Sequence, residues 1–144
     1  MIDTHSHIYE PEFDTDREDV VQRARQAGVE HILLPNINAG SIEPMMALCN
    51  QYPDYCYPML GLHPEDVKQD CEAVLDVMWR KLQSPHPFIA IGEVGLDFYW
   101  SREFEKEQME AFEVQVQWSV EPRLPLMIHC RKAQNEMVKL LRRY

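Results

Sequence analysis

Short apolar runs alternate with longer amphipathic stretches along the whole chain, and this alternation constrains the fold more than any other feature. The apolar runs predict strands at residues 1–7, 29–34, 55–62, 87–93 and 124–129. Apolar residues at helical spacing predict helices at residues 14–27, 71–82, 103–120 and 134–143, with a short helix after Ser41. Strict strand–helix alternation indicates right-handed crossovers and a parallel sheet.

Two α/β architectures fit this pattern. An open, doubly wound sheet of five strands would be complete within the 144 residues of the chain. An eight-unit (β/α) barrel needs about 250 residues, so the chain would form only part of one. No linker or low-complexity tract interrupts the repeat, so we expect residues 1–144 to belong to one domain.

Polar side chains gather at the predicted ends of the strands. His5 and His7 follow the first strand, His63 the third, Glu93 the fourth and His129 the fifth. The carboxyl ends of parallel strands share one face, where α/β proteins build their sites. His5 and His7, two residues apart on a strand, point to the same side. Histidines and a carboxylate on one face predict a hydrolase-type metal site with ligands His5, His7, Glu93 and His129.

Other candidate residues have simpler interpretations. His31 and His86 stand at strand starts and are interpreted as surface or structural residues. Cys130 would point away from the side of His129, which favours a packing role. The aromatic residues 98–100 are interpreted as loop packing rather than as a platform for stacking bases, with a contact to substrate as the alternative. A buried Glu93 requires a partner, which either a metal or an arginine could supply.

Composition narrows the function classes. A formal net charge of −10 argues against a broad electrostatic nucleic-acid binder, but not against an enzyme acting on phosphate esters, because bound cations add local positive charge. No apolar run reaches the length of about 18 residues that a membrane span needs. The N-terminus does not read as a signal peptide, and the four cysteines lack Cys-x-x-Cys spacing, so we expect a cytoplasmic protein with reduced thiols.

Four segments together resemble the TatD family of metal-dependent deoxyribonucleases, within the amidohydrolase-like barrel group. They are Ile-Asp-Thr-His-Ser-His at 2–7, Gly-Leu-His-Pro at 61–64, Ala-Ile-Gly-Glu-Val-Gly-Leu-Asp-Phe-Tyr at 90–99 and Leu-Pro-Leu-Met-Ile-His-Cys-Arg at 124–131. The resemblance covers the whole chain and corresponds to the first part of the family's fold. It implies a (β/α)₈ TIM-barrel-type hydrolase, of which residues 1–144 supply about the first five β/α units.

The resemblance also implies roles for individual residues around two divalent metal ions. His5 and His7 would hold one metal, Glu93 would bridge both as the catalytic carboxylate, and His129 would help to hold the second. Mg, Mn and Zn all suit such a set of nitrogen and oxygen ligands to different degrees.

Two further residues receive supporting roles from the same resemblance: His63 and Arg131 would contact the phosphate of the substrate. A metal-bound histidine also needs an acceptor that orients its ring, and Asp97 is the candidate for that role.

The implied reaction is hydrolysis of phosphodiester bonds in DNA by a water that two metals activate. The family's later motifs, a histidine after the fifth strand and an aspartate on the last strand, have no counterpart within residues 1–144, so we expect weak or no activity from this chain alone. Its first and fifth strands would be open edges, which favours self-association or pairing with a complementary half.

Two other functions stay open at this stage. The chain could belong to another barrel hydrolase that acts on amide, ester or lactone bonds. It could also be a non-catalytic metal-binding fragment that keeps four ligands and lacks the catalytic aspartate.

Overall fold

A computed structural model describes all of residues 1–144, and it contains five strands and five α-helices in alternation. The elements are β1 (Ile2–Asp3), the 3-10 helix η1 (Pro11–Phe13), α1 (Arg17–Gln26), β2 (His31–Leu34), α2 (Ile42–Gln51), β3 (Cys56–Pro58), the 3-10 helix η2 (Pro64–Asp66), α3 (Cys71–Leu82), β4 (Ile91–Asp97), α4 (Glu105–Val120), β5 (Leu126–Arg131) and α5 (Gln134–Leu141). The predicted alternation is therefore confirmed.

The strands lie side by side in sequence order. β1 pairs with β2, β2 with β3 and β4 with β5, all in parallel. A parallel bridge between Leu60 and Ile91 joins the two groups, with Leu60 N–H donating to Ala90 O (3.2 Å) and Gly92 N–H donating to Leu60 O (2.9 Å). A doubly wound sheet reverses its strand order at a switch point. The continuous order from β1 to β5 is instead that of a barrel wall.

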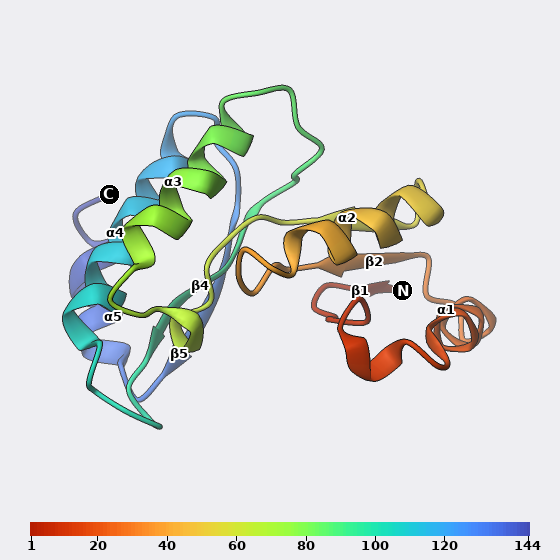
Figure 1. Cartoon of the computed structure of the whole chain (residues 1–144), viewed down its shortest axis with the longest axis horizontal. Helices are drawn as coiled ribbons and strands as arrows, with labels where there is room; N and C mark the ends of the chain where they lie inside the picture. Colours follow the sequence, from red (N-terminus) through yellow and green to blue (C-terminus); the bar gives the residue numbers. More distant parts are fainter.

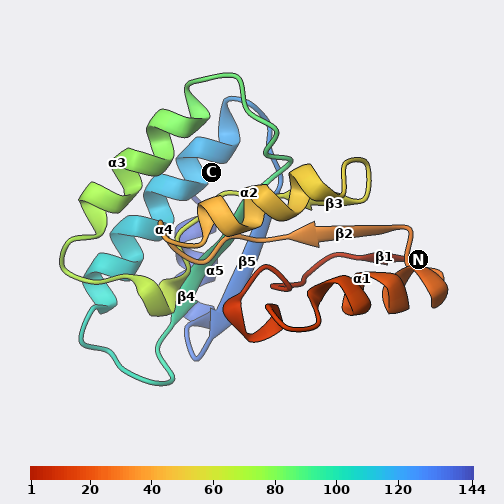
Figure 2. The ribbon, with the colours of Figure 1, turned by 45° about the vertical axis from the view of Figure 1, so that its right-hand side comes forward.

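The helices divide between the two parts of this wall. Helices α1 and α2 lie beside β1–β3, α4 and α5 lie beside β4 and β5, and α3 packs on α4 (Figures 1 and 2). The helix α4 contributes the fully buried Phe112, and β4 contributes Ile91 and Leu96, which are also inaccessible to solvent. Leu60, in the segment after β3, is equally buried. Burial of these large apolar side chains is the main force that holds helices and strands together. None of the helices combines the length and apolar character that crossing a membrane requires.

Several strand boundaries differ from the predicted ones. β1 ends at Asp3 rather than at residue 7, and beyond it only the bond from Ser6 N–H to Leu33 O (3.2 Å) continues the contact with β2. His5 and His7 thus lie on an extended segment after the strand. β4 runs from Ile91 to Asp97, four residues later than predicted at both ends.

The shift of β4 has a physical cause at Gly95. This residue has φ +146° and pairs with His129, and a Cβ added to it would collide with the backbone oxygen of His129. Only glycine permits this close passage of β4 against β5. The strand therefore continues past Glu93, which lies within the strand and not at its end.

Candidate metal centre

A buried carboxylate lies at the centre of the candidate site. Glu93 on β4 is 5% exposed, and four histidines surround its two oxygens. His5 and His7 come from the segment after β1, His63 from the segment after β3, and His129 from β5. We call His5, His7, His63, Glu93 and His129 the Glu93 cluster. Segments distant in sequence thus meet at one end of the parallel strands.

His5 and His7 face one oxygen of the carboxylate. His5 Nε2 lies 3.0 Å and His7 Nε2 3.3 Å from Glu93 Oε2, and the two Nε2 atoms are 3.1 Å apart. The three ligand atoms lie within 4.8 Å of one another, which suits a shared cation. Imidazole nitrogen and carboxylate oxygen are ligands that Zn, Mn and related divalent ions accept.

The other oxygen of the carboxylate faces a second pair of histidines. His129 Nδ1 lies 3.3 Å and His63 Nε2 3.5 Å from Glu93 Oε1. These atoms also form a compact group of potential ligands. The two oxygens of Glu93 therefore point into two separate groups of nitrogens, an arrangement that allows one carboxylate to contact two cations.

The surrounding histidines control the charge of Glu93. Burial by itself would raise the pKa of this carboxyl, but hydrogen bonds from His129 and His63 outweigh burial and hold the pKa well below its usual range. For His129, the contact with Glu93 raises the pKa of the imidazole, burial opposes that rise, and Asp97 adds to it. The carboxylate is thus ionised and available to a cation at neutral pH.

Tyr9 fixes the tautomer of His7. The Tyr9 hydroxyl donates to Pro35 O at 2.6 Å, so its oxygen must accept the hydrogen bond of 2.9 Å from His7 Nδ1–H. Neutral His7 then has a lone pair and no proton on Nε2, and this nitrogen faces Glu93 Oε2. Both atoms are hydrogen-bond acceptors, so neither donates to the other. A cation between these atoms would turn that unfavourable contact into two coordination bonds, so the residues fit a metal.

Asp97 holds His129 in a similar way. His129 Nε2 donates to Asp97 Oδ2 at 2.8 Å, which leaves His129 Nδ1 directed at Glu93. Asp97 is 2% exposed, and its other oxygen accepts the Tyr99 N–H at 2.9 Å. Burial would raise the pKa of Asp97, but the hydrogen bonds from Tyr99 and His129 lower it below its usual value. Either a proton or a cation on His129 Nδ1 satisfies this geometry.

His63 presents a proton rather than a lone pair. The backbone N–H of Glu65 donates to His63 Nδ1 at 3.2 Å, so neutral His63 carries its proton on Nε2. That nitrogen points toward Glu93 Oε1. In this tautomer His63 can donate a hydrogen bond to an anionic group but cannot coordinate a metal through Nε2.

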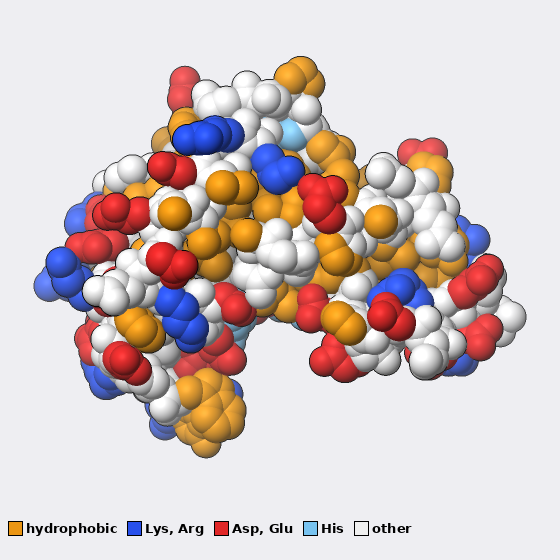
Figure 3. All heavy atoms as spheres, viewed as in Figure 1, with side chains coloured by type: hydrophobic (Ala, Val, Ile, Leu, Met, Phe, Trp, Pro, Cys, Tyr) orange, Lys and Arg blue, Asp and Glu red, His pale blue; other side chains and the backbone are white.

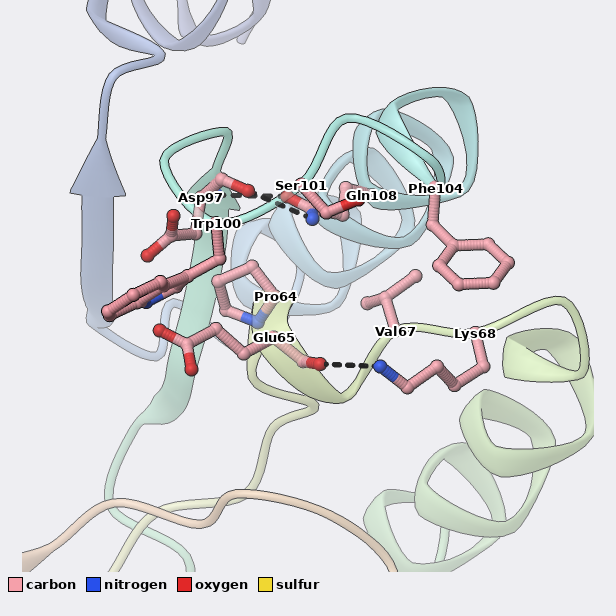
Figure 4. Close-up of a pocket in the computed structure, with 9 residues that line it drawn as sticks. All are labelled: Pro64, Glu65, Val67, Lys68, Asp97, Trp100, Ser101, Phe104 and Gln108. Atoms are coloured by element: carbon pink, nitrogen blue, oxygen red, sulfur yellow. Dashed lines mark hydrogen bonds between the residues drawn. The ribbon is translucent and has the colours of Figure 1, made fainter.

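A cavity of about 290 Å³ adjoins the cluster on the side of Asp97 (Figure 4). The carboxylates of Asp97 and Glu65 and the indole of Trp100 lie on the same side of it in the close-up. Glu65, Asp97 and His129 form a third group of possible ligands. Neither Tyr9 nor Glu65 could be picked out beforehand, because a lone tyrosine and an exposed glutamate carry no distinctive spacing.

The remaining candidates lie outside the Glu93 cluster. Arg131 is exposed and stacks on Tyr99, with its guanidinium carbon 3.7 Å from the ring centroid. His31 packs on Tyr57 and His86 on Phe88, in keeping with structural roles.

One interpretation of side-chain packing near β5 needs correction. Cys130 is an exposed free thiol and fills no core space, because the outer strand β5 leaves its side chain in solvent. Phe98 packs in the core as expected. Tyr99 and Trp100 are 48% and 68% exposed, meet edge to face and lie against the guanidinium of Arg131.

The sequence model of the family described as TatD related DNase matches residues 2–144. The chain belongs to the TatD family. It is 38% identical over 141 residues to the 3′-5′ ssDNA/RNA exonuclease TatD of Pectobacterium carotovorum, covering 98% of this chain and 54% of that protein. It is 35% identical to the uncharacterized metal-dependent hydrolase YabD of Bacillus subtilis, and the match covers 99% of this chain and 55% of YabD. This TatD chain thus spans about half the length of the curated relatives it matches.

Solved structures agree with this assignment. The structure of YJJV, a TatD homolog from Escherichia coli K12, superposes with a TM-score of 0.88 at 32% identity, over 99% of this chain and 55% of that one. A TatD family hydrolase from Entamoeba histolytica shares the fold with a TM-score of 0.77 at 20% identity. The expected fold is confirmed: the chain forms about the first five β/α units of a TIM-barrel-type fold.

Proposed function

We propose that this chain carries the N-terminal part of the active site of a metal-dependent hydrolase that cleaves phosphodiester bonds in DNA. The observation that carries the proposal is the buried Glu93 carboxylate, whose two oxygens face two groups of histidines. The TatD relatives include proteins named as exonucleases on single-stranded DNA and RNA, which supports a nucleic-acid substrate. We also propose that residues 1–144 belong to a single barrel domain. A cytoplasmic location stays a prediction from the sequence.

In this proposal His5 and His7 would hold one divalent cation, His129 would hold a second, and Glu93 would contact both. The free lone pair on His7 Nε2 supports the first site, and Asp97 supports the second by holding the opposite nitrogen of His129. When bound, a pair of such cations polarises a phosphoryl oxygen and lowers the pKa of a water molecule. Mg, Mn and Zn are the candidate ions.

The chain's own residues then orient the substrate. His63 Nε2–H is available to donate to a phosphate oxygen, and the Arg131 guanidinium supplies a planar cation that matches a phosphate in geometry. Asp97 keeps His129 in one orientation throughout. Because the family's later histidine and aspartate motifs have no counterpart in residues 1–144, we expect weak or no turnover from this chain alone.

The test replaces Glu93 by Gln and measures both metal binding and cleavage. We expect Glu93→Gln to lose at least one equivalent of Mn²⁺ or Zn²⁺ by calorimetric titration, because the amide carries no charge. Any hydrolysis of labelled single-stranded DNA or bis(4-nitrophenyl) phosphate should vanish with it. The exposed Glu121, outside the cluster, provides the matched control Glu121→Gln, which should bind metal as the parent does.

Three outcomes separate the alternatives. Unchanged metal stoichiometry in Glu93→Gln would contradict the role of Glu93 between two cations. Hydrolysis of amides, esters or lactones without cleavage of phosphodiesters would favour the other barrel-hydrolase chemistry. Tight metal binding without turnover on any substrate, even after a complementary half of the barrel is added, would favour a non-catalytic metal-binding unit.

A further inference from the structure

Two aromatic side chains project from the turn after β4 and lie outside the hydrophobic core. Trp100 is 68% and Tyr99 48% exposed, and their rings meet edge to face with centroids 4.7 Å apart. Hydrophobic atoms protrude at the lower tip of the molecule over the β4–α4 connection (Figure 3). Scattered exposed apolar residues need no explanation, but two neighbouring large rings beside a candidate active site do.

The turn that carries these rings is held in a defined position. The buried Phe98 anchors it, and Phe98 N–H donates to Arg131 O at 2.9 Å. Tyr99 N–H donates to Asp97 Oδ1 at 2.9 Å, while Asp97 Oδ2 accepts from His129. One carboxylate therefore connects the aromatic turn to the Glu93 cluster, and the rings keep a fixed relation to the candidate metal centre.

A cation completes the surface. The guanidinium of Arg131 lies 3.7 Å from the ring centroid of Tyr99 and 5.1 Å from that of Trp100, within the range of cation–π contact. Arg131 forms no salt bridge within the chain, and the neighbouring Lys132 forms none either. A chain with a net charge of −10 thus places the unpaired positive charge of Arg131 against its most exposed aromatic pair.

We propose that Tyr99, Trp100 and Arg131 form a stacking platform for a nucleobase of a single-stranded DNA substrate. The platform rests on the proposed function, since it orients the strand whose phosphodiester would reach the Glu93 cluster. Aromatic rings and arginine planes stack on any base, because every base has a π-face. The free N–H edges of Arg131 complement the adjoining phosphate in charge. The partner is therefore a strand with unpaired bases, and recognition does not depend on sequence.

The experiment measures binding of two probes to the 144-residue chain in EDTA, where hydrolysis does not occur. One probe is a labelled thymidine hexamer, and the other is a hexamer of abasic sites with the same number of phosphates. We expect Trp100→Ala to weaken binding of the thymidine hexamer about 5- to 100-fold and to leave the abasic hexamer unaffected. Trp100→Phe, which keeps a ring, should restore most of the affinity.

Two controls keep the result interpretable. Trp79→Phe changes an exposed indole on α3 that stacks on Trp118, and it should leave both affinities unchanged. Thermal unfolding of each variant verifies that the fold is retained. In the parent chain, the thymidine hexamer should quench tryptophan fluorescence, and Trp100→Phe should abolish that quenching.

The platform would be overturned if the parent chain bound both probes with equal affinity. It would also be overturned if Trp100→Ala bound the thymidine hexamer as tightly as the parent chain does. Failure to bind either probe would overturn it too. Calorimetric titration with Mn²⁺, which involves no base, reports on the proposed metal site independently of the platform. Metal binding that depends on Glu93 but is accompanied by no base-dependent binding of DNA would refute the platform alone.

Discussion

At the scale of single residues, the hydroxyl of Tyr9 decides which nitrogen of His7 is available. It donates to Pro35 O and accepts from His7 Nδ1, so the lone pair of His7 is left on Nε2, toward Glu93. Burial, reinforced by the neighbouring Glu10, raises the pKa of the phenol, so it keeps the proton that this arrangement requires. A buried hydroxyl two residues after a candidate ligand thus sets the chemistry of the ligand.

We predict that Tyr9→Phe weakens binding of the cation at His5 and His7 about 10-fold, because the tautomer of His7 is no longer fixed. The unpaired Pro35 carbonyl should also cost about 1 kcal/mol of the free energy of unfolding. Calorimetric titration with Zn²⁺ measures the affinity. Tyr57→Phe is the matched control, since Tyr57 contacts His31 outside the Glu93 cluster. An unchanged affinity in Tyr9→Phe would show that His7 needs no such restraint.

The sequence predicted which histidines and which carboxylate form the site better than it predicted the hydrogen bonds that orient them. His5, His7, Glu93 and His129 could be singled out because each follows or ends an apolar run. Tyr9 could not, because its role depends on the carbonyl of Pro35, 26 residues away in the chain. Contacts of this kind are determined by tertiary structure, so the local spacing of residues does not predict them.

At the scale of elements, the close passage of β4 against β5 determines where Glu93 and Asp97 lie. Gly95 lies between Glu93 and Asp97 in the strand, and it lets the strand continue alongside His129. The sequence pattern predicted a strand that ends at residue 93, since glycine and a carboxylate usually mark the end of an apolar run. The observed strand includes both, because its polar residues find histidine partners within the sheet.

We predict that Gly95→Ala destabilises the fold by about 3 kcal/mol or more, because the added Cβ would collide with His129 O at a positive φ. Gly28→Ala is the control, since Gly28 has φ +82° but no neighbouring atom within 4 Å of the position that an alanine Cβ would take. It should cost only about 1–2 kcal/mol. Urea unfolding of both variants provides the comparison. Equal losses would mean that the contact with His129 O does not constrain β4.

At the scale of the whole molecule, sequential strand order distinguishes a barrel wall from an open sheet. The alternation of strands and helices fitted both architectures, and only the neighbours of each strand separate them. Long-range pairing between Leu60 and Ile91 supplies that information, and no periodicity within either segment encodes it. The length of the strands was overestimated for the same reason: pairing partners, not apolar runs, set where a strand stops.

The two outer strands lead to a prediction about association. β1 and β5 each have a neighbour on one side only, and their residues Ile2 and Ile128 are 51% and 39% exposed. Unpaired strand edges with apolar side chains favour pairing with another chain. We therefore predict concentration-dependent self-association by size-exclusion chromatography with light scattering, reduced by Ile128→Lys. A monomer at all concentrations that unfolds cooperatively would contradict this prediction.

We infer that the two oxygens of Glu93 lie between two cation sites. An anomalous difference map from crystals of the chain grown with Zn²⁺ tests this placement directly. We expect one peak in contact with His5 Nε2, His7 Nε2 and Glu93 Oε2, and a second in contact with His129 Nδ1 and Glu93 Oε1. A map without a peak at either oxygen of Glu93, with Zn²⁺ bound elsewhere or absent, would contradict the placement of cation sites at this carboxylate.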